Sequence, residues 1–388
     1  MNKITYKNLA AFHPGYYIKE LIEEMEITQS EFALRLDTTG KTLSKLINGE
    51  IPLSKNLAEN LSLMTGTSVS VWLNLQAKYD EQYCIIECER KIDAEKDRLT
   101  MLHYDYFLKL GFVENYSEKN QQVKELCRVL NVASLSVLEK QDLLTACKTS
   151  ISEVDIKNVV NANAWIQLGK IIARDINCKP YSQDNLLKAI PIFRSLTRKV
   201  LSTAFEQIQK IFFDCGVALV ALPYMKDSGL NGAVQWINNN KVMLLINDRG
   251  KDAAKFWFTL FHEIDHILHK KTTFTYLTSE DKNSKILFLG RANEDEEKMA
   301  DNFAKNQLIP SVDYNKFVAK QNFSLSAIQK FADTVGIATY IVIGRLKHDH
   351  FLNWNDLTNH QPRYQFICPN FKLIKIGSFK AGEMILPS

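Results

Sequence analysis

Two histidines four residues apart, His262 and His266, flank a glutamate, Glu263, within the run from Phe258 to His269, FTLFHEIDHILH. On a helix, residues four apart lie on one face, so both imidazoles can bind one metal ion. Glu263 then lies within reach of a water molecule on that ion and can take its proton. This pattern indicates a zinc hydrolase with two nitrogen ligands, an open coordination position and a carboxylate base. The alternative is an amphipathic helix with two core histidines.

A catalytic zinc usually has a third protein ligand. The metzincin continuation of the motif would require Gly at position 269 and His at position 272, but the chain has His269 and Thr272. His269 lies on roughly the right face, one turn beyond His266. We expect its imidazole to be satisfied elsewhere, because a polar group there needs no metal to explain it.

The expected third ligand is Glu297, in the acidic segment that leads to Leu308-Ile309-Pro310. Glu297 shares a helix face with Ala300 and Ala304, whose small side chains would let this helix approach the His262 helix closely. Most other carboxylates of the segment are explained by helix capping and by the helix dipole. Glu294 is the alternative ligand.

Short apolar segments must position these residues. Gly216–Pro223, Ala233–Ile237 and Lys241–Asn247 are typical of strands, and the last two are separated by a turn of three asparagines. A small sheet therefore precedes the His262 helix. In many zinc peptidases an edge strand of such a sheet holds an extended substrate.

The run from Trp257 to His266, the Glu297-x-x-Ala300-x-x-Phe303-Ala304 pattern, Leu308-Ile309-Pro310 and Gly344-Arg345-Leu346 together resemble the ImmA/IrrE family of metallopeptidases. The likeness covers about residues 215–352. It implies a zinc-dependent endopeptidase, with Mn²⁺ or Fe²⁺ as alternative metals, that cleaves a repressor or an antitoxin. It also implies metal ligation by His262, His266 and Glu297, with Glu263 as the catalytic base. Asp265 departs from the family, which often has Gly there.

The N-terminal part predicts a helix-turn-helix. Thr28 and Glu31 form a capping-box pair, and the next helix, from Thr39 to Asn48, has an apolar face and ends before Gly49. The side chains expected to face DNA are Gln29, Thr39, Lys41, Thr42, Ser44 and Lys45.

Phe12–Gly15, Thr28-Gln29, Leu43–Leu46, Asn48-Gly49 and Trp72–Gln76 resemble the HigA-type antitoxin branch of the Xre-like helix-turn-helix family. The resemblance implies a small helical domain that binds operator DNA, usually as a homodimer, or that holds a partner protein. Residues 12–80 contain six Lys or Arg and nine Asp or Glu, a balance of six minus nine, or −3. DNA affinity would therefore depend on where Lys41, Lys45 and Lys55 lie.

The 388 residues suffice for two or three domains, and the net charge of +4 does not by itself indicate nucleic-acid binding. The start of the chain lacks the apolar core of a signal peptide, and no run is long enough to span a membrane. Seven cysteines without a Cys-x-x-Cys pair indicate reduced thiols. We therefore expect a cytoplasmic protein with no membrane partner.

The sequence thus predicts a multidomain, mainly α protein with an α+β part. The expected domains are a helix-turn-helix bundle at 1–80, a helical connecting domain at 81–205, and a zincin-like metallopeptidase domain at 206–352. A second helix-turn-helix-like segment is expected at 326–346, with plain packing helices as its alternative, and a strand-forming tail at 353–388. The expected function is a zinc endopeptidase fused to a DNA-binding head. The alternative is a DNA-binding regulator or antitoxin whose metal domain senses or binds a partner without turnover.

Overall fold

The computed structural model describes residues 2–140, 156–270, 273–276 and 294–367, which form two compact units, Met1–Lys96 and Asp97–Ser388. The predicted domain end at residue 80 falls inside a continuous helix, α5 (Val69–Ala94). The predicted end at residue 205 does not separate units, because residues on both sides of it belong to the second unit. In the described part of the chain, no helix is long and apolar enough to cross a membrane.

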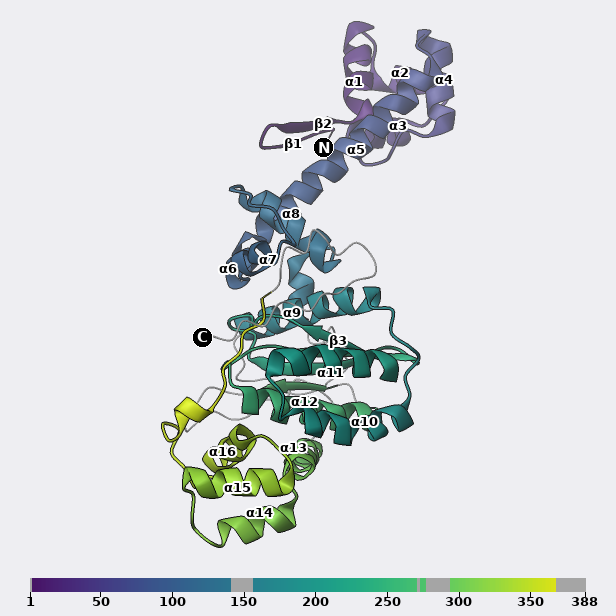
Figure 1. Ribbon diagram of the computed structural model, residues 1–388. Coiled ribbons are helices and arrows are strands. Elements are labelled where there is room, and N and C mark those ends of the chain that lie inside the picture. Colours follow the sequence, from purple (N-terminus) through teal and green to yellow (C-terminus); the bar gives the residue numbers. More distant parts are fainter. Residues whose placement is uncertain (1, 141–155, 271–272, 277–293, 368–388) are drawn as a thin grey trace. The chain divides into compact units, whose positions relative to one another are not determined.

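The first unit is a bundle of five helices with a two-stranded hairpin (Figure 1). Each of α2, α3 and α4 begins at a Ser or Thr whose hydroxyl accepts a hydrogen bond from a backbone N–H three residues later. Phe32, Leu43, Leu46 and Leu61 are fully buried between the helices. The elements of this unit are β1 Lys3–Tyr6, β2 Leu9–Phe12, α1 Pro14–Glu24, α2 Gln29–Arg35, α3 Gly40–Ile47, α4 Lys55–Thr65 and α5.

The second unit surrounds a four-stranded sheet of order β3-β5-β4-β6. Strands β3 and β5 are parallel, whereas β4 is antiparallel to both β5 and β6. The predicted segments form β3 Val217–Ala221, β4 Leu230–Asn238 and β5 Lys241–Ile246, whereas β6 Thr273–Tyr276 has no counterpart among the predicted strands. Among the described strands, β6 is the outer one next to β4.

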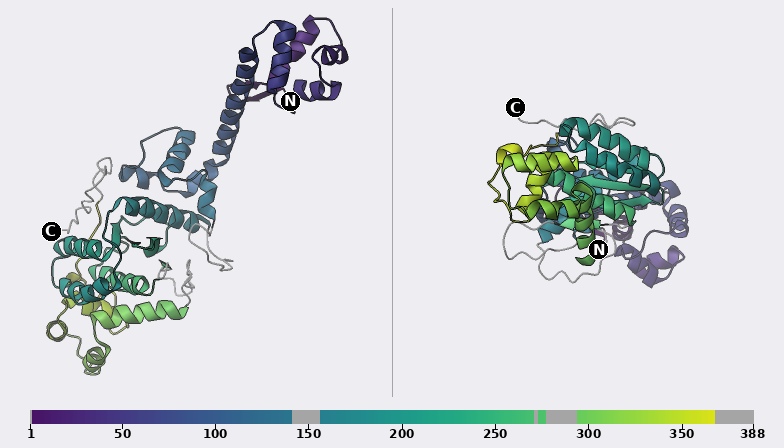
Figure 2. Two further views of the ribbon diagram at one scale, coloured as in Figure 1. Left: turned by 90° about the vertical axis from the view of Figure 1, so that its right-hand side faces the viewer. Right: turned by 60° about the horizontal axis from the view of Figure 1, so that its bottom comes forward.

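Helices cover both faces of this sheet: α9 (Ile156–Asp175) lies on one face and α12 (Ala253–Leu268) on the other (Figures 1 and 2). Gly169 of α9 lies directly against Leu245, and Gly232 of β4 lies directly against Glu263 of α12. The middle of α9 is buried on all sides, from Val159 to Ile166. This helix therefore belongs to the core of the second unit, which is why residues 81–205 do not stand apart as the expected connecting domain.

The second unit contains eleven further described elements. They are α6 Lys96–Met101, α7 Tyr104–Lys109, α8 Lys119–Leu130, η1 Leu135–Glu139, α10 Gln183–Leu196, α11 Leu201–Cys215, α13 Glu294–Leu308, α14 Ser311–Val318, α15 Leu325–Val335, α16 Thr339–His348 and η3 Thr358–His360.

Helices α15 and α16 are joined by a tight turn, as expected for residues 326–346. Helix α16 packs on α12, and Ile341, Val342, Ile343 and Leu346 are buried in the core. No residue of α16 before His348 is exposed. This burial favours packing helices over a second DNA-reading segment.

The segment after α16 is part of the fold as far as residue 366, which corrects the expectation of a separate tail from 353. Tyr364 and Phe366 are buried at 3% and 2% exposure. Tyr364 N–H donates to Lys251 O, and Ala253 N–H donates to Pro362 O, each at 3.0 Å. We call residues 361–366 the C-terminal strap, because they run beside the chain that enters α12. The strand-like pattern at 371–376 lies outside the described residues.

Candidate metal centre and DNA-binding surface

Helix α12 carries the His-Glu-x-x-His motif through the core of the second unit. The helix begins at Asp252, whose Oδ1 accepts a hydrogen bond from the Lys255 N–H at 2.9 Å. Thirteen of its sixteen residues are buried, because the sheet, α13 and α16 all pack against it. His262 and His266 are 6% and 0% exposed. Both imidazoles therefore lie inside the protein, where each needs a polar partner.

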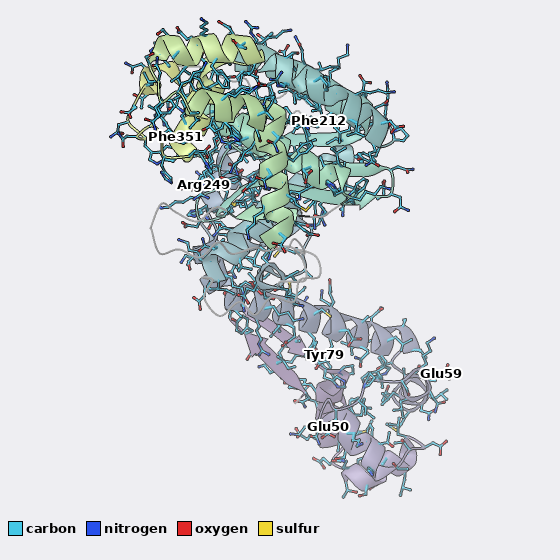
Figure 3. The ribbon with its side chains drawn as sticks, turned by 90° about the horizontal axis from the view of Figure 1, so that it is seen from below. Glu50, Glu59, Tyr79, Phe212, Arg249 and Phe351 are labelled. Atoms are coloured by element: carbon cyan, nitrogen blue, oxygen red, sulfur yellow. The ribbon has the colours of Figure 1, made fainter. Side chains whose placement is uncertain are left out.

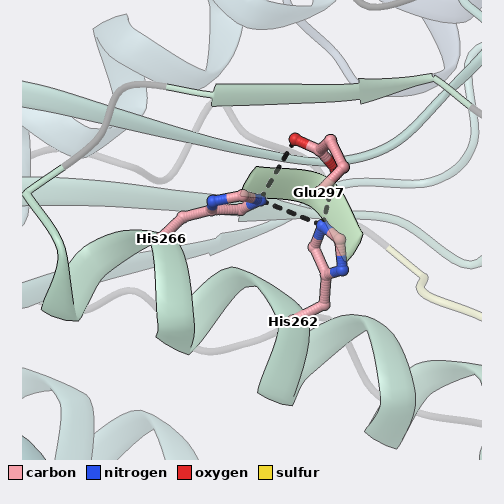
Figure 4. Close-up of side chains that lie close together, drawn as sticks. All are labelled: His262, His266 and Glu297. Carbon is pink, nitrogen blue, oxygen red and sulfur yellow. Dashed lines mark hydrogen bonds and ion pairs between the residues drawn. The ribbon is translucent and has the colours of Figure 1, made fainter. Parts of the chain in front are cut away.

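Helix α13 supplies that partner. Glu297 is 6% exposed and lies on the same buried face as Ala300 and Ala304, which are 0% and 2% exposed. The two alanines bring α13 close to α12, so the Glu297 carboxylate reaches both histidines (Figure 4). The side chain of Glu294, the alternative ligand, lies outside the described residues.

The geometry of the three side chains fits a metal ion. His262 Nε2 lies 3.0 Å from His266 Nε2 and 3.1 Å from Glu297 Oε2, and His266 Nε2 lies 3.4 Å from Glu297 Oε1. Ligand atoms on a tetrahedral zinc, with bonds of about 2.0–2.1 Å, are about 3.3 Å apart. Among the described residues, this is the one group of three His, Cys, Asp or Glu donors close enough together for a metal. A tetrahedral ion held by these three donors would have its fourth position open to water or substrate.

Without a metal ion, the surroundings of His262 favour its protonated imidazolium form. Burial lowers the pKa of His262, but hydrogen bonds to Asp301 and Glu297 and the charge of Glu263 outweigh it, and the pKa rises to about 10. Burial raises the pKa of Glu297, but its bonds to both histidines lower that pKa to about 2. Because a metal needs the neutral imidazole, metal binding would displace this proton.

Asp301, one turn after Glu297 on α13, is a residue that the sequence motifs do not single out. Its Oδ1 lies 2.9 Å from His262 Nδ1, so the carboxylate holds the outer ring nitrogen while Nε2 faces the cluster. Carboxylates in this position fix the tautomer of a metal-binding histidine. The sequence feature that could have indicated Asp301 is its position four residues after Glu297, because residues four apart lie on one face of a helix. The outer nitrogen of His266, Nδ1, is buried and has no hydrogen-bond partner among the described residues.

Glu263 is fully buried and faces β4. A Cβ at Gly232 of this strand would lie 2.5 Å from Glu263 Oε1 and 3.0 Å from Cδ. Such a contact is too short for any side chain, so the position of the Glu263 carboxylate depends on a glycine at 232. Nothing in the sequence connects these two residues.

His269 stays outside the cluster, as expected. Its Nδ1 lies 2.9 Å from the Asp265 carbonyl oxygen and 3.3 Å from Asp265 Oδ1. The imidazole is about half exposed, whereas Asp265 is 5% exposed. His269 therefore caps the C-terminal end of α12 through its contacts with Asp265.

The predicted DNA-binding residues lie on α2, α3 and the turn between them. Gln29, Thr39, Lys41 and Lys45 are exposed, and Thr42 and Ser44 are partly exposed. Thr39 also caps α3, because its Oγ1 accepts a hydrogen bond from the Thr42 N–H at 3.1 Å. The apolar side of α3 is buried through Leu43, Leu46 and Ile47. The two lysines thus stand on the outer face of a helix whose other face is fixed in the core.

Comparisons with known proteins bear on this first unit. Residues 18–72 match the family described as helix-turn-helix. The uncharacterized HTH-type transcriptional regulator YddM of Escherichia coli K12 is 32% identical over 85 residues, which cover 22% of this chain and 86% of that protein. Virulence-associated protein A' of Dichelobacter nodosus is 38% identical over 81 residues, or 21% of this chain and 70% of that protein.

A solved structure from Nostoc punctiforme is also similar. Its description is an antidote protein of a plasmid maintenance system. It is 27% identical, with a TM-score of 0.21, and the match covers 22% of this chain and 92% of that one.

Proposed function

Because its N-terminal part makes this chain a member of the helix-turn-helix family, we propose that the protein is a DNA-binding regulator that carries a zinc-dependent endopeptidase in its second unit. The observation that supports the peptidase is the convergence of His262, His266 and Glu297 on one point, with Glu263 following the first histidine. The resemblance to ImmA/IrrE peptidases agrees with this donor set. Mn²⁺ and Fe²⁺ are alternatives to zinc, because affinity alone does not decide metal occupancy.

In the proposed reaction, Nε2 of His262, Nε2 of His266 and the Glu297 carboxylate would hold the ion. A bound zinc ion would supply Lewis acidity and lower the pKa of water to about 7. Glu263 takes the proton of the attacking water and delivers it to the leaving amine. Asp301 keeps His262 in the tautomer whose Nε2 lone pair faces the cluster.

Strand β6 is a suitable place for the substrate backbone. It is one of the two outer described strands of the sheet and pairs with β4, which carries Gly232 beside Glu263. An extended peptide can add to such an edge through backbone hydrogen bonds. The proposed substrate is a repressor, an antitoxin or another partner protein, as the family resemblance implies.

The first unit would bring the enzyme to operator DNA. Lys41 and Lys45 of α3 are exposed beside Thr39, Thr42 and Ser44. A helix held by its apolar face, with polar side chains outward, is what a recognition helix requires. The regulator YddM, to which this part is similar, is named as a transcriptional regulator. We propose binding as a homodimer, because this class of motif reads paired half-sites.

The peptidase is tested by comparing protein termini in cells that make the wild-type chain or Glu263→Gln, before and after DNA damage. Glu206→Gln, an exposed glutamate on α11, is the matched control. We expect new termini in the wild-type and Glu206→Gln strains that are missing with Glu263→Gln. Identical termini in all three strains would contradict the peptidase.

A second candidate is a regulator whose metal site senses or binds a partner without turnover. The helix-turn-helix match favours it, because that match concerns DNA binding and not hydrolysis. Operator binding measured with and without zinc separates the candidates. If the metal site is a sensor, zinc should change the DNA affinity of both the wild-type and the Glu263→Gln protein. His262→Ala should abolish that change, and no partner protein should be cleaved.

A further inference from the structure

The second half of helix α5 has one face that is covered by the hairpin of β1 and β2. Lys7 Nζ lies 2.6 Å from the Asp93 carboxylate, and the Tyr6 hydroxyl donates a hydrogen bond to the same carboxylate. Tyr79, labelled in Figure 3, lies on this face too, with its ring centroid 4.8 Å from that of His13. The hairpin therefore fixes which face of α5 is turned outward.

The opposite face of α5 carries five exposed residues whose positions differ alternately by four and three. They are Ala77, Glu81, Cys84, Cys88 and Lys91, and we call them the thiol stripe. Alternating steps of three and four are the spacing by which one helix presents a continuous seam to another helix. The stripe belongs to the first unit and lies on a different helix from the proposed DNA-contacting lysines of α3.

The thiol stripe is complementary to itself when two copies run antiparallel. Cys84 and Cys88 lie two residues on either side of Ile86, and Glu81 and Lys91 lie five residues on either side. About a twofold axis level with Ile86, residues equally far from that level on the two copies meet. Each Cys84 therefore meets Cys88 of the second copy, and each Glu81 meets Lys91 of the second copy.

A parallel pairing of the same faces is unfavourable. It would place every residue of the stripe beside its own copy, so that two Glu81 carboxylates and two Lys91 ammonium groups would repel each other. Glu81 also lies 2.6 Å from Lys78 of its own helix, but both side chains are more than half exposed, and such pairs stabilise little. Charge complementarity thus selects a second copy of this chain in the antiparallel direction.

The residues beside the stripe agree with this pairing. Ile85 and Glu87 flank it near the twofold axis, so each would lie close to its own copy. Ile85 is 39% exposed, and the contact would remove two apolar side chains from water. The charge of Glu87 is balanced within its own chain by Arg90, whose Nη1 lies 2.7 Å from the carboxylate.

We propose that the thiol stripe docks a second copy of this chain antiparallel, and that two Cys84–Cys88 disulfides lock the pair under oxidising conditions. From Ala77 to Lys91 the stripe spans about 21 Å, at about 1.5 Å per residue. Stable interfaces bury about 1,200–2,000 Å², which two short helix faces do not reach. The disulfides therefore decide whether the pair persists. The proposal goes beyond the proposed function, because it depends on neither DNA binding nor hydrolysis.

The oxidant in this proposal is hydrogen peroxide. The thiolate of one cysteine attacks a peroxide oxygen and becomes a sulfenic acid, and the other oxygen leaves as hydroxide. The thiolate of the opposite cysteine then attacks the sulfenic sulfur, forms the S–S bond and releases a second hydroxide. The two protons that the thiols lost convert both hydroxides to water. Two thiols and one peroxide thus give one disulfide and two waters.

Two single variants of the full-length chain distinguish the arrangements. Cys84→Ser keeps only Cys88 in the stripe, and Cys88→Ser keeps only Cys84. In peroxide, neither variant alone should form a covalent dimer through the stripe, because like cysteines do not meet. A mixture of the two should form a heterodimer, because each remaining thiol then meets its partner. Electrophoresis without reductant, with a size tag on one variant, separates the heterodimer from homodimers.

The wild-type chain should form a covalent dimer in peroxide that dithiothreitol reverses. Mass spectrometry of tryptic peptides should find the linkage between two copies of segment 79–90, which contains both cysteines. Cys127→Ser removes a partly exposed cysteine of α8 and should leave the dimer yield unchanged. A wild-type chain that stays monomeric, or a disulfide within one chain, would overturn the proposal. Homodimers of each single variant that form as readily as the heterodimer would also overturn it.

A charge exchange tests the register independently of the thiols. At low salt and limiting peroxide, Lys91→Glu should slow dimer formation severalfold, because two carboxylates then meet. Glu81→Lys combined with Lys91→Glu should restore the rate, and Lys210→Glu, at an exposed position of α11, should not change it. A double variant as slow as Lys91→Glu alone would show that Glu81 and Lys91 do not meet and that the antiparallel register is wrong.

Discussion

At the scale of single residues, Gly232 is a sharp test of the proposed base. In Gly232→Ala the new Cβ would force the buried Glu263 carboxylate aside, because the two would be 2.5 Å apart. We expect the metal ligands to be undisturbed and kcat to fall about 100-fold, as a misplacement of about 1 Å does. Zinc stoichiometry and kcat, measured on the same preparation, check this.

Gly344→Ala is the matched control for strain, because its Cβ would lie 2.6 Å from the Cβ of Ala254 and not beside Glu263. This variant should unfold at a lower temperature but keep its kcat per folded molecule. Equal reductions of kcat in the two variants would argue against a special role for Gly232.

Asp301 should affect metal affinity. Asp301→Asn removes the carboxylate that holds His262 Nδ1, and such changes lower metal affinity about 10- to 100-fold. Competition with a chromophoric zinc chelator measures it. Asp295→Asn, an exposed aspartate on the same helix, should keep wild-type affinity. A wild-type affinity in Asp301→Asn would show that the 2.9 Å hydrogen bond does not orient the ligand.

The sequence indicates the three candidate metal ligands but not the glycine beside the proposed base, because only the ligands follow from helical spacing. His262, His266 and Glu297 are predictable because helical spacing and a pair of alanines define which faces meet. The role of Gly232 is not predictable, because it depends on which residue of β4 stands opposite α12. That pairing is decided by the register of β4 against β5, in which Gly232 lies opposite Ile246.

At the scale of elements, the start of α1 should be sensitive to acid. His13 is buried and its Nδ1 accepts a hydrogen bond from the Gly15 N–H at 3.0 Å. Burial lowers the pKa of His13 below the usual 6.5, although the charge of Asp80 opposes it. The unfolded chain therefore takes up the proton first. Stability from this cap is complete above about pH 6.5 and is lost as the pH falls towards the lower folded pKa.

Hydrogen exchange of the α1 amides, corrected for intrinsic rates, measures this change between about pH 7.5 and pH 5, a range that brackets the usual histidine pKa. His13→Asn keeps a capping acceptor without a titrating group and should remove the pH dependence. Helix α4, capped by the Ser54 hydroxyl, is an internal control that should not respond. A pH response of equal size in α4 would assign the effect to the whole unit.

Helix α3 should account for part of the salt dependence of operator binding. Lys41→Gln and Lys45→Gln should each weaken binding and reduce the slope of log affinity against log salt by about 1 for each phosphate that is no longer neutralised. Lys78→Gln, on the exposed side of α5, should change neither. Titration of operator DNA at several salt concentrations measures the slope. An unchanged slope in both α3 variants would mean that another surface meets the phosphates.

Elements with strong end signals are predictable, whereas short strands are not. Thr28 and Thr39 indicate the starts of α2 and α3 because each hydroxyl can accept a hydrogen bond at a helix start. Strands β1, β2 and β6 have four residues each and escape prediction. Four residues are too few for alternation to be distinguished from a loop, so pairing partners alone define them.

At the scale of the whole molecule, zinc should stabilise the second unit and leave the first unchanged. A ligand that binds only the folded state stabilises by RT ln(1 + [L]/Kd), which predicts a rise in Tm of roughly 5 °C at free zinc about 100-fold above Kd. Scanning calorimetry with zinc or with a chelator measures it. His262→Ala should abolish the shift. A shift confined to the helix-turn-helix unit would place the metal elsewhere.

Domain organisation is the least predictable feature. The change from helical to strand patterns near residue 215 suggests a boundary at 205, but α9 and α10 pack on the sheet and on α12 and α13. Helical periodicity shows which side of a helix is apolar but not which element covers it. The three donors that the family resemblance indicated do lie together, whereas the domain that holds them extends beyond the expected 206–352.

The C-terminal strap has a practical consequence for anyone who shortens or extends this chain. The fully buried Lys347 ammonium donates a hydrogen bond to the Trp354 carbonyl oxygen at 2.9 Å and also contacts Gln361. The Tyr364 hydroxyl donates a hydrogen bond to the Asn247 carbonyl oxygen. A clone that stops at residue 352 would leave the Lys347 ammonium group without these acceptors. It would also remove the strap residues that pair with the chain at the start of α12. A clone that stops after residue 367 would keep both. Cloning boundaries and affinity tags should therefore be placed beyond Ile367, although the ImmA/IrrE likeness itself ends near residue 352.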